Sequence, residues 1–220
     1  MSTPSRHGRA GGSLGGRPRN EAIDVAALDA TLEILTEKGY PRLSFEEVAQ
    51  RAGTSRPALY RRWPDRPSLA LSAIGRRLSV PHPPDTGCTL CDFAESFTVF
   101  LSAHRTIRPE ILSAVYADCA EDENLRQAYV ATVITPTRCA VAETLDRAVR
   151  RGDIRDDVNR EQILDFLASL VHYRALFDRS HLTDSEAMSA VTTLLRGVAV
   201  DYDALLAHSR ELEADHHDSH

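Results

Sequence analysis

Residues 44–63 read SFEEVAQRAGTSRPALYRRW and carry the clearest structural pattern in the chain. Ser44 followed by Glu47 has the spacing of a capping box, in which both side chains satisfy backbone N–H groups at the start of a helix. The apolar Val48 follows at once, and Gly53 breaks the helix after about two turns. The first part of the stretch therefore predicts a short, capped helix that ends near Arg51.

The second part of the stretch predicts another short helix, rich in arginine and aromatic residues. A hydroxyl at Thr54 or Ser55 can cap it, and Pro57 is tolerated in a first helical turn. Two short helices joined by a tight turn form a helix-turn-helix, whose second helix fits the major groove of B-DNA. Arginine on that helix can read guanine edges and hold phosphates. The pattern therefore predicts a DNA-binding module.

One helix is expected on each side of this module. Apolar residues from Val25 to Leu35 recur at spacings of 3, 4 and 3, which is the stripe of an amphipathic helix that Gly39 ends. A further helix follows Asp65 and stops at a proline cluster that begins at Pro81.

These signals divide the chain into four parts. Residues 1–20 hold five glycines, four arginines and no acid, so we expect a flexible basic arm there. A DNA-binding domain is expected over residues 21–80, a larger helical domain over 81–209, and a disordered tail rich in acids and histidine over 210–220.

The larger domain shows helical periods without an alternating strand pattern. Pro136 should kink or divide the third of its helices. The helices that we expect there cover residues 89–104, 109–120, 123–151, 160–179 and 184–208. The predicted fold class is all-α.

The charge distribution agrees with a polyanionic partner at one end of the chain. The whole chain has a formal net charge of -6, yet residues 1–79 hold 13 Lys/Arg against 8 Asp/Glu, a net charge of +5. A basic head on an acidic body suits nucleic acid at the head.

Other classes of protein lack support in the sequence. No uncharged stretch approaches the roughly 20 residues that span a bilayer, and no signal peptide is evident. We therefore expect a cytoplasmic protein without a membrane partner. Nucleotide-binding, hydrolase and metalloprotease motifs do not occur, so we expect no enzyme activity and no cofactor.

Residues 44–74 resemble the tetracycline-repressor (TetR) family, whose recognition helix ends in a Leu-Tyr-x-x-aromatic run followed by a basic residue. Residues 59–63 read LYRRW, and Arg66 follows. The sequence departs from the family at Trp63, where phenylalanine is usual, and at Arg66, where lysine is usual. Both changes keep the chemistry, whereas Pro57 offers only an apolar contact and leaves the base preference at that position open.

The resemblance implies a fold and a function. The fold is an N-terminal three-helix helix-turn-helix domain followed by a larger helical domain for ligand binding and dimerisation. The function is sequence-specific transcription regulation by a homodimer on a palindromic double-stranded operator, most simply as a repressor that a small-molecule effector releases.

The resemblance also places individual residues at the DNA. Tyr60 and Arg66 would touch phosphates, the first residues of the recognition helix would face bases, and the arginines of the arm would enter the minor groove. We expect Trp63 to pack between helices instead. The residues expected at the DNA are Arg17, Arg19, Ser44, Thr54, Ser55, Arg56, Pro57, Ala58, Tyr60, Arg61, Arg62 and Arg66.

Residues 151–158, which read RGDIRDDV, and the apolar helix after them resemble a C-terminal domain common in the family. We expect two apolar helix faces there to pair across a twofold axis; the alternative is that they form internal core only. The expected interface residues are Ile163, Phe166, Leu167, Leu170, Val171, Val191, Leu194, Leu195 and Val198. For the effector pocket, the candidates are Phe97, Phe100, His104, Tyr116, Cys119, Tyr129, Cys139, His172 and Tyr173.

Cys88 and Cys91 form a CxxC motif, which can bind zinc or cycle through a disulfide. A second CxxC is missing, so we expect no metal site and four reduced, unconnected cysteines. Two alternatives to the main prediction stay open. One is a redox-responsive DNA-binding regulator that acts through this pair, and the other is a ligand-binding protein with a vestigial DNA-binding motif.

Overall fold

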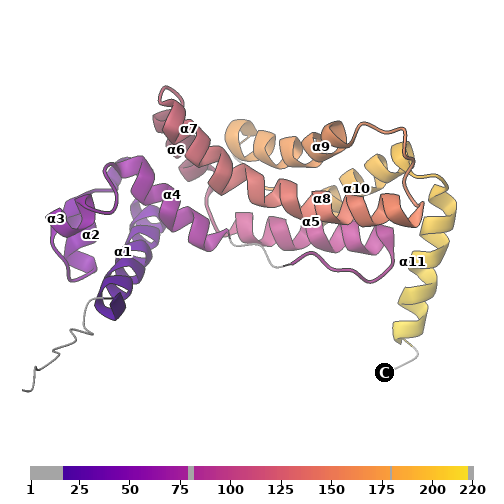
Figure 1. The fold of residues 1–220 in the computed structure, drawn as a ribbon, viewed down its shortest axis with the longest axis horizontal. Helices are drawn as coiled ribbons and strands as arrows, with labels where there is room; N and C mark the ends of the chain where they lie inside the picture. Colours follow the sequence, from indigo (N-terminus) through magenta and orange to yellow (C-terminus); the bar gives the residue numbers. More distant parts are fainter. Residues whose placement is uncertain (1–16, 79–81, 179, 218–220) are drawn as a thin grey trace, which may run out of the picture.

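The fold is known from a computed structural model, which describes residues 17–78, 82–178 and 180–217. These residues form helices, without a strand among them (Figure 1). The α-helices are α1 (Arg17–Lys38), α2 (Phe45–Arg51), α3 (Arg56–Tyr60), α4 (Arg66–Arg77), α5 (Thr89–Arg105), α6 (Pro109–Cys119), α7 (Glu123–Tyr129), α8 (Thr135–Arg151), α9 (Arg160–Tyr173), α10 (Asp184–Val198) and α11 (Tyr202–His217). A 3-10 turn, η1 (Tyr40–Arg42), and two π-helical turns, η2 (Val130–Ile134) and η3 (Arg174–Asp178), complete the set. The all-α prediction is confirmed.

The first turns of α2 and α3 are capped by the hydroxyl side chains that the sequence predicts. Ser44 accepts a hydrogen bond from the Glu47 amide at 3.3 Å, and Ser55 accepts one from the Ala58 amide at 3.4 Å. Each hydroxyl satisfies a backbone donor that has no partner inside the helix. Between the two helices Gly53 adopts a φ of 62°, a conformation that glycine takes without strain.

The carboxylate of Glu47 does not complete the predicted capping box. It accepts hydrogen bonds from Lys38 Nζ and Arg51 Nη2, both at 2.7 Å. Both bonds lower the pKa of the Glu47 carboxyl, and the bond from Lys38 has the larger effect. Glu47 is thus bound to two cations and joins α2 to the end of α1.

Two element boundaries differ from the sequence prediction, and one predicted division is present. α1 begins at Arg17, so the last four residues of the predicted arm are helical, and α11 continues to His217, well into the predicted tail. The predicted helix 123–151 is divided by η2, and Pro136 lies in the first turn of α8, as its missing N–H donor leads one to expect.

The prediction of one helix over residues 184–208 is wrong, because the chain is extended between α10 and α11. Ala199 forms an isolated antiparallel bridge with Ile154. The Arg155 amide donates to the Val198 carbonyl at 3.0 Å, and the Val200 amide donates to the Asp153 carbonyl at 2.9 Å. These bonds use backbone groups that a continuous helix would need.

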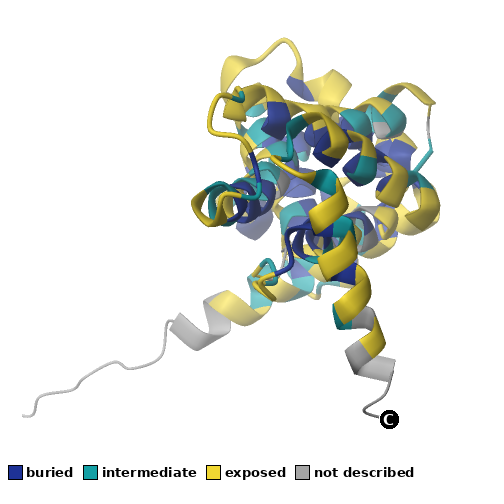
Figure 2. Cartoon of the chain, turned by 90° about the vertical axis from the view of Figure 1, so that its right-hand side faces the viewer, coloured by how far each residue is buried: buried dark blue, intermediate teal, exposed yellow. Residues whose placement is uncertain are grey.

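The buried apolar residues form two cores. The first, here called the junction core, combines α1 to α4 with α6, α7 and η2. The second, here called the body core, combines α5 with α8, α9 and α10. In Figure 2 the dark blue buried segments lie in the middle of the bundle, and the helix that leads to the C-terminus is exposed along most of its length. The junction core thus crosses the boundary that the sequence places near residue 80.

Cys88 and Cys91 are joined by a disulfide. The expectation of four unconnected cysteines is therefore wrong for this pair, while Cys119 and Cys139 are free. The two cysteines meet because they lie three residues apart in the turn that starts α5.

Across the described ranges, no helix combines the length and the apolar character needed to cross a bilayer.

Candidate nucleic-acid interface

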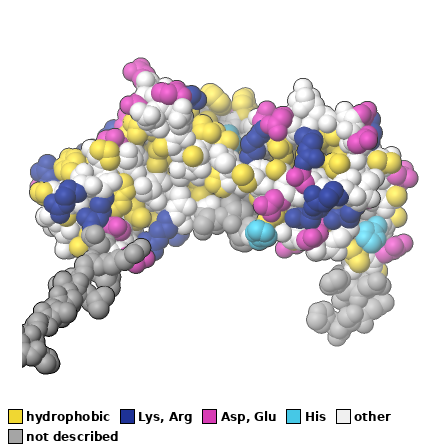
Figure 3. All heavy atoms as spheres, in the orientation of Figure 1, with side chains coloured by type: hydrophobic (Ala, Val, Ile, Leu, Met, Phe, Trp, Pro, Cys, Tyr) yellow, Lys and Arg dark blue, Asp and Glu magenta, His cyan; other side chains and the backbone are white. Residues whose placement is uncertain are grey.

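The recognition helix α3 turns one face inward and leaves the other open. Leu59 is fully buried and Ala58 nearly so, whereas Arg56, Pro57 and Arg61 are exposed. Figure 3 shows Lys and Arg side chains at the end of the molecule that α2 and α3 occupy. A helix held by its apolar face can thus present cations and small side chains to a groove.

Tyr60 is placed at the edge of this surface. Its ring stacks on Phe45 of α2, with centroids 4.2 Å apart and planes 7° apart, yet the residue is 47% exposed. This stacking contact with Phe45 holds the Tyr60 ring in one orientation. The accessible remainder of the side chain suits contact with a phosphate.

Arg62 is held by its own chain. It forms an ion pair with Asp24 of α1, and its Nη1 donates to the Ala58 carbonyl at 2.8 Å. Its side chain is 17% exposed, unlike that of its neighbour Arg61. Of the two adjacent arginines, Arg61 is therefore the one that faces solvent.

Arg66 lies in a polar contact, here called the seam, between the DNA-binding half (α1 to α4) and α6. Its Nη2 donates to Asp118 Oδ2 at 2.6 Å, Tyr40 Oη donates to the same oxygen at 2.7 Å, and the guanidinium lies 4.6 Å from the Tyr40 ring centroid. The pKa of the Asp118 carboxyl is lowered by the Arg66 bond and then by the Tyr40 bond. Burial and the Asp118 bond raise the Tyr40 pKa.

The remaining residues expected at the DNA have varied positions. Ser44 and Ser55 are exposed and serve as helix caps, and Thr54 is half-buried in the turn. The side chains of Arg17 and Arg19 lie outside the described residues. Trp63 packs in the junction core, as expected, and its Nε1 donates to Ser72 Oγ at 3.0 Å.

Sequence analysis missed one exposed arginine and one carboxylate. Arg42 is exposed in η1, next to the N-terminus of α2, but a 3-10 turn carries no helical period that would single it out. Asp118 sits on a helix 52 residues beyond Arg66, so no local signal connects the two.

The candidates for the effector pocket do not come together. Cys119 and Tyr129 are buried in the junction core, where Tyr116 packs edge-on against Tyr129 at 5.2 Å. Phe97 belongs to the body core, and His172 is buried, which lowers its pKa to about 4.

Among the other pocket candidates, Cys139 and Tyr173 are exposed. The side chains of Phe100 and His104 lie outside the described residues. The seven candidates whose side chains are described are thus divided between the two halves of the interior and the surface.

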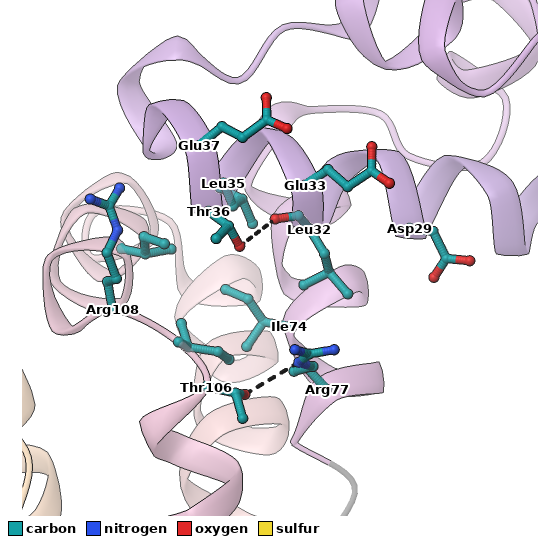
Figure 4. A pocket seen from close by; sticks show the side chains of 12 residues that line it. Asp29, Leu32, Glu33, Leu35, Thr36, Glu37, Ile74, Arg77, Thr106 and Arg108 are labelled. Carbon is teal, nitrogen blue, oxygen red and sulfur yellow. Dashed lines mark hydrogen bonds between the residues drawn. The ribbon is translucent and has the colours of Figure 1, made fainter.

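A groove that sequence analysis did not predict lies between α1, α4 and the segment before α6 (Figure 4). It encloses about 430 Å³. Asp29, Glu33 and Glu37 lie along its α1 side, and Arg77 and Arg108 lie across from them. The even spacing of the three acids along α1 is the sequence signal that could have found it.

Most of the residues expected at the dimer interface face their own chain. Phe166 is exposed, and Leu170 and Val198 are partly buried. The body core takes up the others, which are Ile163, Leu167, Val171, Val191, Leu194 and Leu195. The free side of α9 and η3 instead carries Phe166, Tyr173 and Phe177, the last of which is 72% exposed.

Two protein-family models match this chain. The model described as bacterial regulatory proteins of the tetR family matches residues 27–73, and the model described as the tetracyclin repressor-like C-terminal domain matches residues 83–194. The second match alone spans half of the chain. The chain belongs to the TetR family. It is therefore a helix-turn-helix, DNA-binding transcription regulator.

Individual relatives of this TetR-family regulator match it over most of their length. The HTH-type transcriptional regulator YdeS of Bacillus subtilis (strain 168) is 28% identical over 191 residues, which cover 83% of this chain and 93% of YdeS. AqdR of Rhodococcus erythropolis is 29% identical over 201 residues, which cover 90% and 93% of the two chains. The solved structure of the TetR family transcription regulator SCO0332 has a TM-score of 0.62 and 30% identity, and covers 80% of this chain and 98% of its own.

Arg66 and Asp118 provide a test of whether the seam arginine also serves the DNA. Arg66→Ala should weaken binding to a duplex selected from a random pool, and should reduce the slope of log affinity against log salt by about 0.9 for each phosphate that the variant no longer neutralises. Asp118→Ala should leave affinity unchanged or raise it, because it removes the carboxylate that competes for Arg66. Titrations at several salt concentrations measure both effects. Equal weakening by the two variants would mean that Arg66 acts only through its bond to α6.

Proposed function

We propose that this regulator is a homodimeric repressor that binds a palindromic operator and leaves it when a small molecule binds the C-terminal domain. The observation that carries the proposal is that α3 has one buried side, while Arg56 and Pro57 on it and Arg61 directly after it are exposed. One helix of this length offers few base contacts. Two copies related by a twofold axis double them and read half-sites about 34 Å apart.

The residues proposed to contact DNA differ in their freedom to do so. Arg56 is exposed on α3, Arg61 is exposed directly after it, and Tyr60 at its end is held by Phe45. Arg62 and Arg66 have carboxylate partners, so DNA would have to compete for them. We therefore assign base and phosphate contacts first to Arg56 and Arg61.

The second copy is proposed to dock on the outer side of α9, η3 and α10. Phe166, Tyr173, Phe177 and Met188 are large apolar residues left exposed there. A groove of about 280 Å³ runs between α9 and α10, with Phe166 in its wall. Clustered exposed apolar residues mark an interaction surface more often than a solvated one, and the same face on two copies makes a self-complementary contact.

The effector is proposed to act near Tyr129. Its side chain is fully buried, and its hydroxyl has no hydrogen-bond partner among the described residues. A buried hydroxyl without a partner costs free energy, which a ligand that accepts its hydrogen bond would recover. The π-helical turn η2 begins directly after Tyr129, and such turns occur frequently at functional sites.

Contacts around Tyr129 supply a route from effector to DNA. Tyr129, Leu112 and Val133 share the junction core with Leu69 and Ile74 of α4. A shift of α6 or η2 would thus be transmitted to the helix that follows α3. A coupling of about 1 to 3 kcal/mol would change operator occupancy several-fold to a hundredfold. Such a repressor acts where the chromosome is, in the cytoplasm.

Operator binding is tested by Arg61→Ala. The full chain should select a palindromic duplex from a random pool, and the variant should bind that duplex at least tenfold more weakly, since each half-site then faces one cation fewer. Arg150→Ala, an exposed arginine on α8, is the matched control and should bind like the unchanged protein. Fluorescence anisotropy measures both affinities. If the unchanged chain prefers no duplex over random sequence, the DNA-binding motif is vestigial and the proposal fails.

Dimerisation through α9 and η3 is tested by Phe177→Asp. A carboxylate in a face that becomes buried would be left without a partner, so the variant should be a monomer by light scattering at concentrations where the unchanged chain is a dimer. Val25→Asp, also at a partly exposed apolar position but on α1, should remain a dimer. A dimer that survives Phe177→Asp at every concentration would place the interface elsewhere.

Effector binding is tested by thermal shift with a compound library. A compound that binds the native state raises the melting temperature, and the proposal requires that it also release the selected duplex. Tyr129→Phe should fold normally and lose most of the shift, because only the hydroxyl is removed. A compound that stabilises both proteins equally binds at another site.

A further inference from the structure

We propose that Cys88 and Cys91 form a reversible dithiol-disulfide site that exchanges with low-molecular-weight thiols. The two sulfurs are bonded in the first turn of α5. Disulfides that persist for structural reasons are rare in thiol-reducing compartments. A CxxC pair at the start of a helix is instead suited to exchange.

Cys88 occupies the capping position of α5. The Asp92 amide donates to the Cys88 carbonyl at 2.8 Å, and the Cys91 amide donates to Cys88 Sγ at 3.2 Å. A side-chain atom that accepts the amide three residues ahead is placed as an N-cap acceptor. When the disulfide opens, the thiolate on Cys88 is therefore stabilised by a backbone N–H group and by the helix dipole.

The charges around this turn are already compensated. Asp92 is fully buried and close to the cysteines, but it accepts hydrogen bonds from the Thr86 amide at 2.9 Å and the Thr86 hydroxyl at 2.7 Å. Arg151 Nη2 lies 3.4 Å from the other Asp92 oxygen. The carboxylate thus has three donors of its own, which limits its repulsion of a thiolate on Cys88.

The two cysteines differ in exposure, which favours one direction of exchange. Cys88 is 1% exposed, whereas Cys91 is partly exposed and its Sγ lies 3.5 Å from Ser209 Oγ of α11. An incoming thiolate therefore attacks Cys91 Sγ. The family match ends at residue 194. The contact of Cys91 with Ser209 therefore comes from α11, a helix outside the matched segment.

The exchange balances with two thiols of the reductant. The first thiolate forms a mixed disulfide with Cys91 and releases Cys88 as a thiolate. A second thiolate attacks the sulfur of the bound reductant and releases Cys91 as a thiolate and the reductant as its disulfide. Two electrons pass from the reductant to the protein, and each protein thiolate takes a proton from water.

A zinc site at these cysteines finds no support in the described part of the chain. No group of three or more His, Cys, Asp or Glu side chains is placed to hold a metal there. Two thiolates without further ligands do not make the four-coordinate site that zinc prefers.

The first test is a redox titration of the folded, full-length chain. In a Cys139→Ser background, which removes the exposed free thiol, the protein is equilibrated with reduced and oxidised glutathione, and its thiols are counted by maleimide labelling and mass spectrometry. We expect Cys88 and Cys91 to become labelled together in one two-electron step. A bond that dithiothreitol opens only after denaturation, or a pair that oxidised glutathione never joins, would overturn the proposal.

The second test uses single-cysteine variants in the same background. Cys88→Ser should leave a reactive Cys91 that forms a mixed disulfide with oxidised glutathione, whereas the buried Cys88 of Cys91→Ser should react at least tenfold more slowly. Far-UV circular dichroism confirms that both variants are folded. Equal rates, or faster reaction of Cys88, would overturn the assignment of Cys91 as the attacked sulfur.

Discussion

Apolar packing of α4 against α6, α7 and η2 is the constraint on which the arrangement of this molecule depends. Leu69 and Ile74 of α4 are fully buried in the same core as Leu112 of α6 and Tyr129 of α7. Protein interiors are close-packed, so a displaced side chain moves its neighbours. The DNA-binding helices α1 to α4 are therefore not positioned independently of the rest of the chain. Their position is set by α6, α7 and η2, which are the elements proposed to respond to an effector.

Around this core, carboxylates of the chain occupy arginines that DNA phosphates would also bind. The chain is acidic overall and carries its positive charge toward the N-terminus. Two of the arginines proposed to contact DNA are bound to carboxylates of the same chain, Arg62 to Asp24 and Arg66 to Asp118. Phosphate would displace a carboxylate when Arg66 contacts DNA, so binding and the contact with α6 draw on the same cation. The seam thus joins α6 to the helix whose arginine is proposed to contact DNA.

The sequence predicted the features that depend on local chemistry. Hydroxyls at Ser44 and Ser55 lie at fixed distances from the amides they cap, and Pro136 lacks a donor wherever it is placed, so helix starts and the division of residues 123–151 could be foreseen. Residues 44–74 also identified the family, because caps, turn and aromatic run must occur together to form the motif.

What the sequence did not predict depends on contacts between distant residues. The break at Ala199 comes with pairing to Ile154, and Gly197, two residues earlier, still lies inside α10, so it does not mark the break by itself. An apolar stripe does not say which partner it faces, so Leu167 and Val191 were expected at a dimer interface although they fill the body core. The partners of Arg62 and Arg66 likewise become visible only when α1 and α6 are placed beside them.

The most direct test of the shared junction core uses Trp63, the single tryptophan of the chain, as a reporter in the DNA-binding half. Leu112→Ala in α6 and Leu145→Ala in α8 each remove a fully buried leucine and should cost about 2 to 5 kcal/mol of stability. Followed by Trp63 fluorescence during denaturant unfolding, Leu112→Ala should lower the midpoint at least as much as Leu145→Ala. A Trp63 transition that moves with Leu145→Ala but not with Leu112→Ala would contradict the shared core.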